Sequence, residues 1–307
     1  MVIHDRSYAR WDGERDRPVR GAWVILDRGV TTGLSQIFKR KFFGQILSFA
    51  AFGPFLFALG MLYLAFFFQA NPEYAEFAQG LGESGLIEIV TPNADNIWGY
   101  FLVVQLWVCL VLCVLVGSSL VAEDRRINAL ELYLSRPVTV LQYILGKLSV
   151  MATFLALVTV LPVGLILLVQ AFLTGFEPEE FARLVDLAWR SILAGGLFVG
   201  MLSLLVVTAS ALASRARNAA ILWIGFLVIL EGLVTNQLRD EFLTPAVNLT
   251  SIHFNLGRCM ASILGNETEL ALYPDLPVSW SGAVLAGWGL LCTVLLLRKV
   301  RPVEVVA

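Results

Sequence analysis

The chain has 307 residues, of which 58% are apolar and only 15% are charged, with a net charge of −2. Soluble domains carry about 25% charged residues, so this composition excludes an ordinary soluble protein and favours a membrane protein. The near-neutral net charge points neither to nucleic acid nor to an acidic partner. Four cysteines are too few for a disulfide framework. Cys109 and Cys113 lie one helical turn apart, and we interpret them as small apolar side chains rather than a soft-metal pair.

Residues 1–43 are polar and basic, without the short apolar core and small-residue cleavage site of a signal peptide. We therefore expect the first apolar run to be an uncleaved anchor. Residues 22–44 mix apolar side chains such as Trp23, Ile25 and Leu34 with a basic cluster at the end. This mixture predicts an interfacial helix on the inner membrane surface. An ordinary basic flank that fixes orientation is the alternative.

A transmembrane helix needs about 20 apolar residues, and six runs approach that length. They are residues 44–68, 98–121, 144–173, 187–213, 218–238 and 279–297. Pro162 lies inside the third run, where it predicts a kink or tilt. Glu231 interrupts the fifth. Residues 44–297 would then form the membrane domain, and residues 298–307 a short tail.

The charges assign sides to these spans. Most of the 22 basic residues fall in the N-terminal segment, the second and fourth connections and the tail. The positive-inside rule places those segments, and both termini, in the cytoplasm. The connection 71–96 carries five acidic residues and no basic one, as an outer loop can. We therefore predict an all-α membrane protein with six transmembrane helices and cytoplasmic termini.

The last outer connection contains a second predicted surface element. Residues 248–265 have apolar side chains at helical spacing, namely Ile252, Leu256, Met260 and Ile263. This spacing predicts an amphipathic helix that lies at the outer interface or dips into the membrane. His253 lies in the same stretch and is a weak candidate for a substrate or metal contact.

The connection between the second and third spans, residues 121–147, is charged and compact. It begins with Glu123, Asp124, Arg125 and Arg126. An apolar stripe of a short helix follows at Ile127, Leu130 and Leu134. Pro137 disfavours helical geometry at Arg136 and ends that helix. Thr139 and Gln142 have capping-box spacing, so a new helix begins near Thr139. The short helix could receive force from a soluble partner, or it could be a charged turn without a partner.

The same connection resembles the signature of ABC-2 type transporter permeases. The residues that carry the resemblance are Glu123, Arg125, Arg126, Leu130, Glu131, Leu134, Ser135, Arg136, Pro137, Leu145, Gly146 and Lys147. The pattern covers about 27 residues in motif, and the six-span architecture agrees with it over the rest of the chain. The pair Asn128-Ala129 departs from it, since many members carry Gly-Thr there.

The resemblance implies that two six-span subunits, identical or different, pair in a bacterial-type cytoplasmic membrane and bind two cytoplasmic ABC ATPase subunits. It implies that the segment after the second span is a coupling helix seated in a groove of the ATPase. The residues expected to form or shape that contact are Glu123, Asp124, Arg125, Arg126, Asn128, Glu131, Arg136 and Pro137. The chain would then be the permease subunit of an ATP-driven exporter.

No phosphate-binding loop of the type Gly-x-x-x-x-Gly-Lys-Ser/Thr occurs in the sequence. We therefore expect no cofactor on this chain, no enzymatic activity of its own, and ATP and Mg²⁺ on the partner ATPase. No protease or metallohydrolase motif is present either. Two other functions stay open: a secondary carrier or channel without an ATPase, and a non-transporting membrane assembly subunit.

Glu231 is a carboxylate within an apolar run, where a charge is costly. It is a candidate residue of the translocation path or an outer gate. The alternative is a carboxylate near the interface that reaches headgroups or water.

Overall fold

The structure is a computed structural model, and the part of the chain that it describes is helical throughout, with no strand. The described residues are 19–39, 41–71, 73–74, 105, 108–129, 139–175, 178–235, 245–265 and 277–300.

The N-terminal helix α1 (Val19–Lys39) is followed at once by α2 (Lys41–Ala70). The predicted helix at residues 22–44 is therefore present, but it ends at Lys39. One face of α1 packs against α8 (Val140–Val158) through buried Ile25 and through glycines. A Cβ at Gly33 would come within 2.7 Å of the Phe154 ring, so a larger residue here would force the ring to shift. Trp23, on the other side of α1, is 65% exposed.

The second predicted span is described at residue 105 and from residue 108 onwards. It is α-helical at 108–115 and then tightens into a 3₁₀ turn, η1 (Gly117–Ser119). The α-helix thus ends before the predicted limit of residue 121. The hydroxyls of Ser118 and Ser119 bond back to the carbonyls of Val114 and Val116, which favours this tightening. A five-residue helix, α6 (Ala122–Arg126), follows directly.

The third predicted span is two helices in succession, α8 and α9 (Val160–Leu173). The Thr139 hydroxyl accepts a hydrogen bond from the Gln142 amide, and the Gln142 side chain accepts one from the Thr139 N–H. This capping box confirms the predicted start of the helix. The predicted irregularity near Pro162 is confirmed as an interruption at Thr159.

Helix α10 (Pro178–Leu212) has 35 residues and begins well before the predicted start at residue 187. Proline is favoured in the first turn of a helix because its missing N–H would have no partner there. The fifth predicted span consists of α11 (Ala216–Leu227) and a π-helical segment, η2 (Val228–Thr235).

The last part of the described chain holds the short 3₁₀ helix η3 (Pro245–Thr250), α13 (Ile252–Leu264) and α15 (Val278–Lys299). The predicted amphipathic helix at 248–265 is α13, and its stripe Ile252, Leu256 and Met260 is buried. Its polar side chains Asn255 and Arg258 are buried as well, because α13 packs against both α10 and α15. An amphipathic helix at the outer interface or dipping into the membrane was expected. The structure packs α13 against two other helices, so that its polar side chains are buried too.

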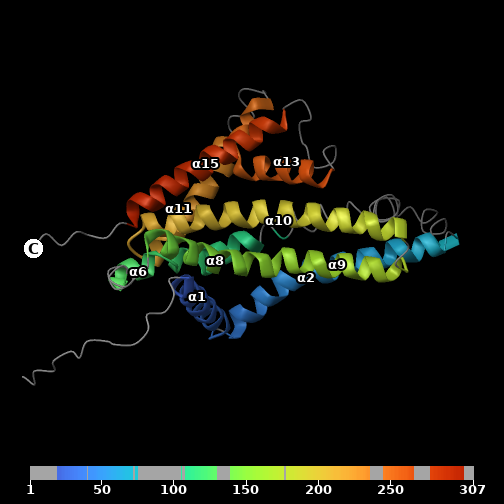
Figure 1. Ribbon diagram of the computed structural model, residues 1–307, viewed down its shortest axis with the longest axis horizontal. Helices are drawn as coiled ribbons and strands as arrows, with labels where there is room; N and C mark the ends of the chain where they lie inside the picture. The colour runs from blue at the N-terminus through green and yellow to red at the C-terminus, as the bar shows by residue number, and fades with distance from the viewer. Residues whose placement is uncertain are drawn as a thin grey trace, which may run out of the picture.

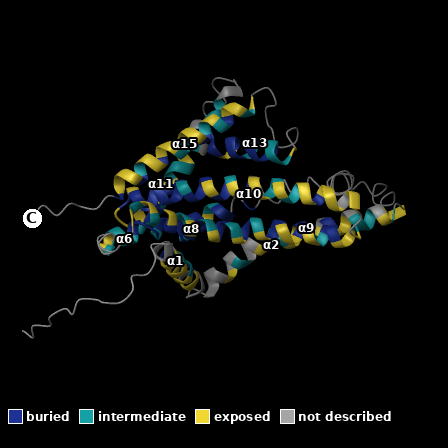
Figure 2. Ribbon diagram, in the orientation of Figure 1, coloured by how far each residue is buried: buried dark blue, intermediate teal, exposed yellow. Residues whose placement is uncertain are grey.

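Figure 1 shows α6, the start of α8, the turn between α10 and α11 and the end of α15 gathered at one end of the molecule. We call this the elbow end. The end of α2, the end of α9 and the start of α10 lie at the opposite end, which we call the far end. The large apolar core runs along α8 and α10, and Figure 2 shows α15 and α1 with long exposed faces outside it.

Three helical stretches are long and apolar enough to cross a membrane: Val140–Leu173, Phe181–Leu212 and Val278–Lys299. Two shorter apolar stretches, Phe52–Phe68 and Ala216–Leu230, accompany them. Many large apolar side chains on these helices are exposed, among them Leu168, Leu290 and Phe57. Exposed apolar surface of this kind is stable in a lipid environment, so the chain is that of a helical membrane protein.

Candidate functional site at the elbow

Helix α6 is too short to be stable by its own hydrogen bonds, so its position depends on its neighbours. It ends at Arg126, and Ile127 lies in a turn. Leu130 and Leu134, the other members of the predicted apolar stripe, lie outside the described residues. Asn128 adopts a left-handed backbone conformation with φ of 54°. Asparagine tolerates this conformation better than most residues. The chain therefore changes direction at Asn128.

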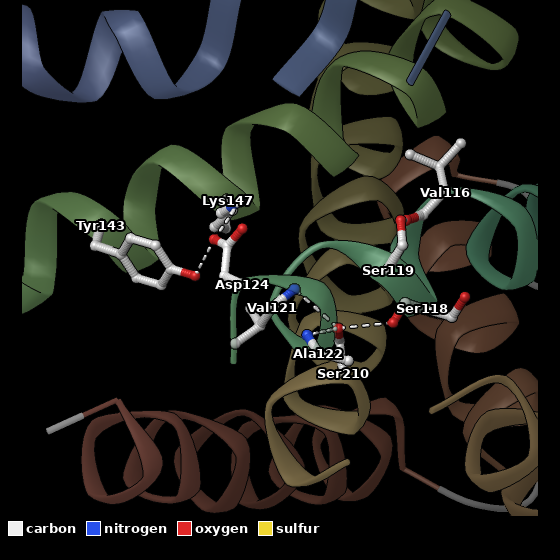
Figure 3. Close-up of polar contacts among 9 residues, drawn as sticks. All are labelled: Val116, Ser118, Ser119, Val121, Ala122, Asp124, Tyr143, Lys147 and Ser210. Carbon is white, nitrogen blue, oxygen red and sulfur yellow. Dashed lines mark hydrogen bonds and ion pairs between the residues drawn. The ribbon is translucent and has the colours of Figure 1, made fainter. Parts of the chain in front are cut away.

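Asp124 fastens α6 to α8. One carboxylate oxygen, Oδ2, accepts a hydrogen bond of 2.6 Å from the Tyr143 hydroxyl and lies 2.7 Å from Lys147 Nζ (Figure 3). Tyr143 and Lys147 are four residues apart on α8 and so project from the same face. The side chains of Lys147 and Asp124 are 10% and 13% exposed, so this is a nearly buried ion pair.

Ser210, near the end of α10, fastens the start of α6. Its hydroxyl oxygen accepts hydrogen bonds of 3.0 Å from the backbone N–H groups of both Val121 and Ala122. The same hydroxyl donates to the Ser118 carbonyl at 2.9 Å, as Figure 3 shows. The first N–H groups of a helix have no partner within it. One serine of a distant helix therefore caps α6 and closes the η1 turn.

Arg125 makes the reciprocal contact. Its guanidinium Nη1 donates to the backbone carbonyls of Ala211 and Ala213, where α10 ends. Basic side chains commonly stabilise the last carbonyls of a helix in this way. Each helix thus caps the other, so α6 cannot move without a corresponding movement of α8 and α10. We call the set Ser118, Asp124, Arg125, Tyr143, Lys147 and Ser210 the elbow network.

The opposite side of α6 is exposed. Glu123 and Arg126 form an ion pair there, with side chains that are 42% and 53% exposed. The hydrogen bond from Arg126 lowers the pKa of the Glu123 carboxyl below its usual range. Ile127 is 56% exposed, and Asn128 is exposed beside it. This side offers charges and one apolar side chain for contact with a partner.

The structure thus divides the predicted coupling residues into two groups. Asp124 and Arg125 are engaged within the chain, whereas Glu123, Arg126 and Asn128 lie on the exposed side. Glu131, Arg136 and Pro137 lie outside the described residues. The backbone of Glu231 is part of η2, but its side chain is not described. His253 is exposed on α13.

Sequence reasoning treated Lys147 as a basic residue of the connection and missed Tyr143, Ser118 and Ser210 as members of the site. A signal for Lys147 was available, because a cation inside an apolar run needs a partner and Asp124 lies one connection upstream. Ser210 gave no signal, since serines are common in apolar helices and its role depends on the approach of α6.

No group of three or more His, Cys, Asp or Glu side chains that could hold a metal ion occurs in the described part of the chain. Cys109 and Cys113 are buried and unbridged within the apolar core.

No protein-family model matches the chain, and no curated protein matches it.

Proposed function

We propose that the chain is the transmembrane permease subunit of an ABC-2 type ATP-driven exporter. The observation that carries the proposal is the elbow network, which fixes a very short charged helix to two long membrane helices while leaving its other side exposed. Through these attachments, a force applied to the exposed side of α6 would reach both long helices. The resemblance of residues 123–147 to the coupling segment of ABC-2 permeases supports the same function.

In the proposed mechanism, the exposed side of the elbow sits against a separate cytoplasmic ABC ATPase subunit that binds ATP and Mg²⁺. Glu123, Arg126, Asn128, Glu131 and Arg136 provide polar complementarity for that contact, which sets partner choice and register more than raw affinity. Closure of the ATPase dimer moves the elbow, and the buried Asp124–Lys147 pair and Ser210 pass the movement to α8 and α10.

The proposal includes a second permease subunit, identical or different, with the pathway between the two subunits in a bacterial-type cytoplasmic membrane. It also includes six spans and cytoplasmic termini. Glu231 stays in it as a candidate residue of the pathway or its outer gate. The apolar character of the spans favours hydrophobic or amphiphilic cargo.

Co-purification with the ATPase subunit tests the proposal. The charge reversals Glu131→Arg with Arg136→Glu, and Glu123→Arg with Arg126→Glu, should each reduce the ATPase recovered with the permease and the transport rate. The control reverses Asp186 and Arg190, an exposed ion pair at i,i+4 spacing on α10, with side chains 59% and 43% exposed. That control should leave association unchanged. Normal association in both elbow reversals would contradict the proposed coupling contact.

A further inference from the structure

The interruption between α8 and α9 has a specific chemical cause. Pro162 has no N–H group, so the carbonyl four residues before it, that of Val158, loses its helical partner. The side-chain amide of Gln105 donates to that carbonyl at 2.8 Å. Gln105 comes from the second predicted span and is fully buried, with 0% exposure. The Val158 carbonyl therefore accepts its hydrogen bond from a side chain of a neighbouring helix rather than from water.

A proline alone does not cause such an interruption in this protein. Pro54 lies inside α2, which continues as one helix from Lys41 to Ala70. At the α8–α9 junction, the Thr159 hydroxyl also donates to the Leu155 carbonyl at 2.8 Å, a bond that bends helices. The junction therefore combines a missing backbone donor, a competing hydroxyl and an external amide.

The junction also lies at the boundary between two apolar clusters. Buried residues of α8, from Tyr143 to Val158, belong to the large core shared with α10, α13 and α15. Buried residues of α9, from Val163 to Ala171, belong to a separate cluster with Ala58 and Leu62 of α2. Helix α10 contributes to both clusters, with Leu184 in the second. The chain thus changes packing partners where its helical hydrogen bonds are interrupted.

At the junction itself, α10 comes close. A Cβ added at Gly195 of α10 would lie 3.1 Å from Val160, so the small residue permits this approach. Helix α10 is uninterrupted and runs alongside both α8 and α9, as Figure 1 shows. Helix α10 is therefore continuous, whereas the neighbouring α8–α9 pair is interrupted.

We propose that the α8–α9 junction is a hinge between an elbow unit, made of α6, α8 and the core around them, and a far unit, made of α9 and α2. Gln105 is its positioning residue, because its amide donates to the Val158 carbonyl in place of the missing Pro162 N–H. This inference deepens the proposed function: movement of the elbow changes the angle between the two units.

A double-mutant cycle on the purified permease in nanodiscs tests the role of Gln105. Gln105→Leu should lower the thermal unfolding midpoint by about 3–6 °C, because a buried carbonyl loses its donor. Pro162→Ala restores a backbone N–H for the Val158 carbonyl, so Gln105→Leu should change the midpoint little in that background. In the Pro54→Ala background, Gln105→Leu should keep its full effect. Equal effects of Gln105→Leu in all three backgrounds would overturn the assignment.

Distances between spin labels test the hinge. Labels at Leu145 of α8 and Leu168 of α9, both about half exposed, are introduced as cysteines after the four native cysteines are replaced by alanine. The distance distribution should be broader in the wild-type sequence than in Pro162→Ala, and unchanged by Pro54→Ala. If Pro162→Ala leaves the width unchanged, the junction is not a hinge.

The same labels separate this inference from the proposed function. With the ATPase subunit bound and nucleotide trapped, the mean distance should shift in the wild-type sequence and not in Pro162→Ala. An equal shift in both would overturn the hinge while supporting the coupling. If no ATPase binds, the coupling fails, and the width of the distribution without nucleotide still decides whether the hinge exists.

Discussion

The two ends of the molecule are held together by different kinds of contact. At the elbow end, charged and hydroxyl side chains join α6 to α8 and α10 over large separations in sequence. At the far end, the described contacts between α2, α9 and α10 come from an apolar cluster of alanine, leucine, valine and isoleucine. Hydrogen bonds and ion pairs fix direction as well as distance, whereas apolar packing is non-directional. Directional contacts therefore fix the elbow end, whereas the described packing at the far end is apolar.

The largest effect should come from the buried ion pair. Asp124→Ala leaves the Lys147 ammonium buried without its carboxylate and should lower the free energy of unfolding by about 3 kcal/mol. Reversible denaturation in mixed micelles measures this. Asp124→Ala combined with Lys147→Met should recover most of the loss. A double variant as unstable as the single one would mean that the pair does not fix the elbow.

A smaller effect is expected at Ser210, and α10 supplies its own control. Ser210→Ala removes the acceptor for two backbone N–H groups and should cost about 2 kcal/mol. Ser203 is buried on the same helix, but its hydroxyl has no hydrogen-bond partner among the described residues. Ser203→Ala should therefore be neutral or slightly stabilising in the same assay. Equal losses at the two serines would show that helix packing, not capping, explains the effect.

At the far end, conservative changes should be tolerated. Ile166 is 1% exposed in the apolar cluster, and Ile166→Val should cost about 1 kcal/mol because one methylene is lost. The label distances at the hinge should stay as in the wild type, since no directional contact is removed. A change in those distances would show that the far end is as tightly specified as the elbow.

The smallest effect should come from the exposed ion pair on α6. Because Arg126 lowers the pKa of Glu123, the pair stabilises the folded state at neutral pH, and this contribution is lost as the pH falls through the lowered pKa. The stability difference between the wild type and Glu123→Gln should therefore be small at neutral pH and vanish in acid. Denaturation at both pH values measures it. If Glu123→Gln lowered the free energy of unfolding as much as Asp124→Ala does, Glu123 would not lie on the exposed side of α6.

Features with a local cause could be predicted from the sequence. The capping box at Thr139, the irregularity near Pro162 and the bounds of α15 each depend on residues a few positions apart, and the structure confirms them. The positive φ of Asn128 and the early start of α10 at Pro178 are also local, but several conformations were compatible with those sequences.

The elbow network could not be predicted in the same way. Ser210 and Ser118 acquire their roles only when α10 and η1 approach one another, and nothing within either segment indicates that approach. The burial of the polar residues of α13 could not be predicted from the sequence for the same reason. Asn255 and Arg258 look like the solvent side of an amphipathic helix, and only packing against α10 and α15 buries them.

The Asp124–Lys147 pair has a consequence for how the chain is made. Lys147 lies two turns inside α8, and an ammonium there opposes entry of that helix into lipid until it is neutralised. The carboxylate that neutralises it is synthesised earlier, in the short helix α6 that precedes α8 in the chain. Within the proposed topology, the two segments would therefore enter the bilayer most readily together, as a helical hairpin with its charges already joined. The contact that stiffens the elbow would thus also favour joint insertion of the two segments.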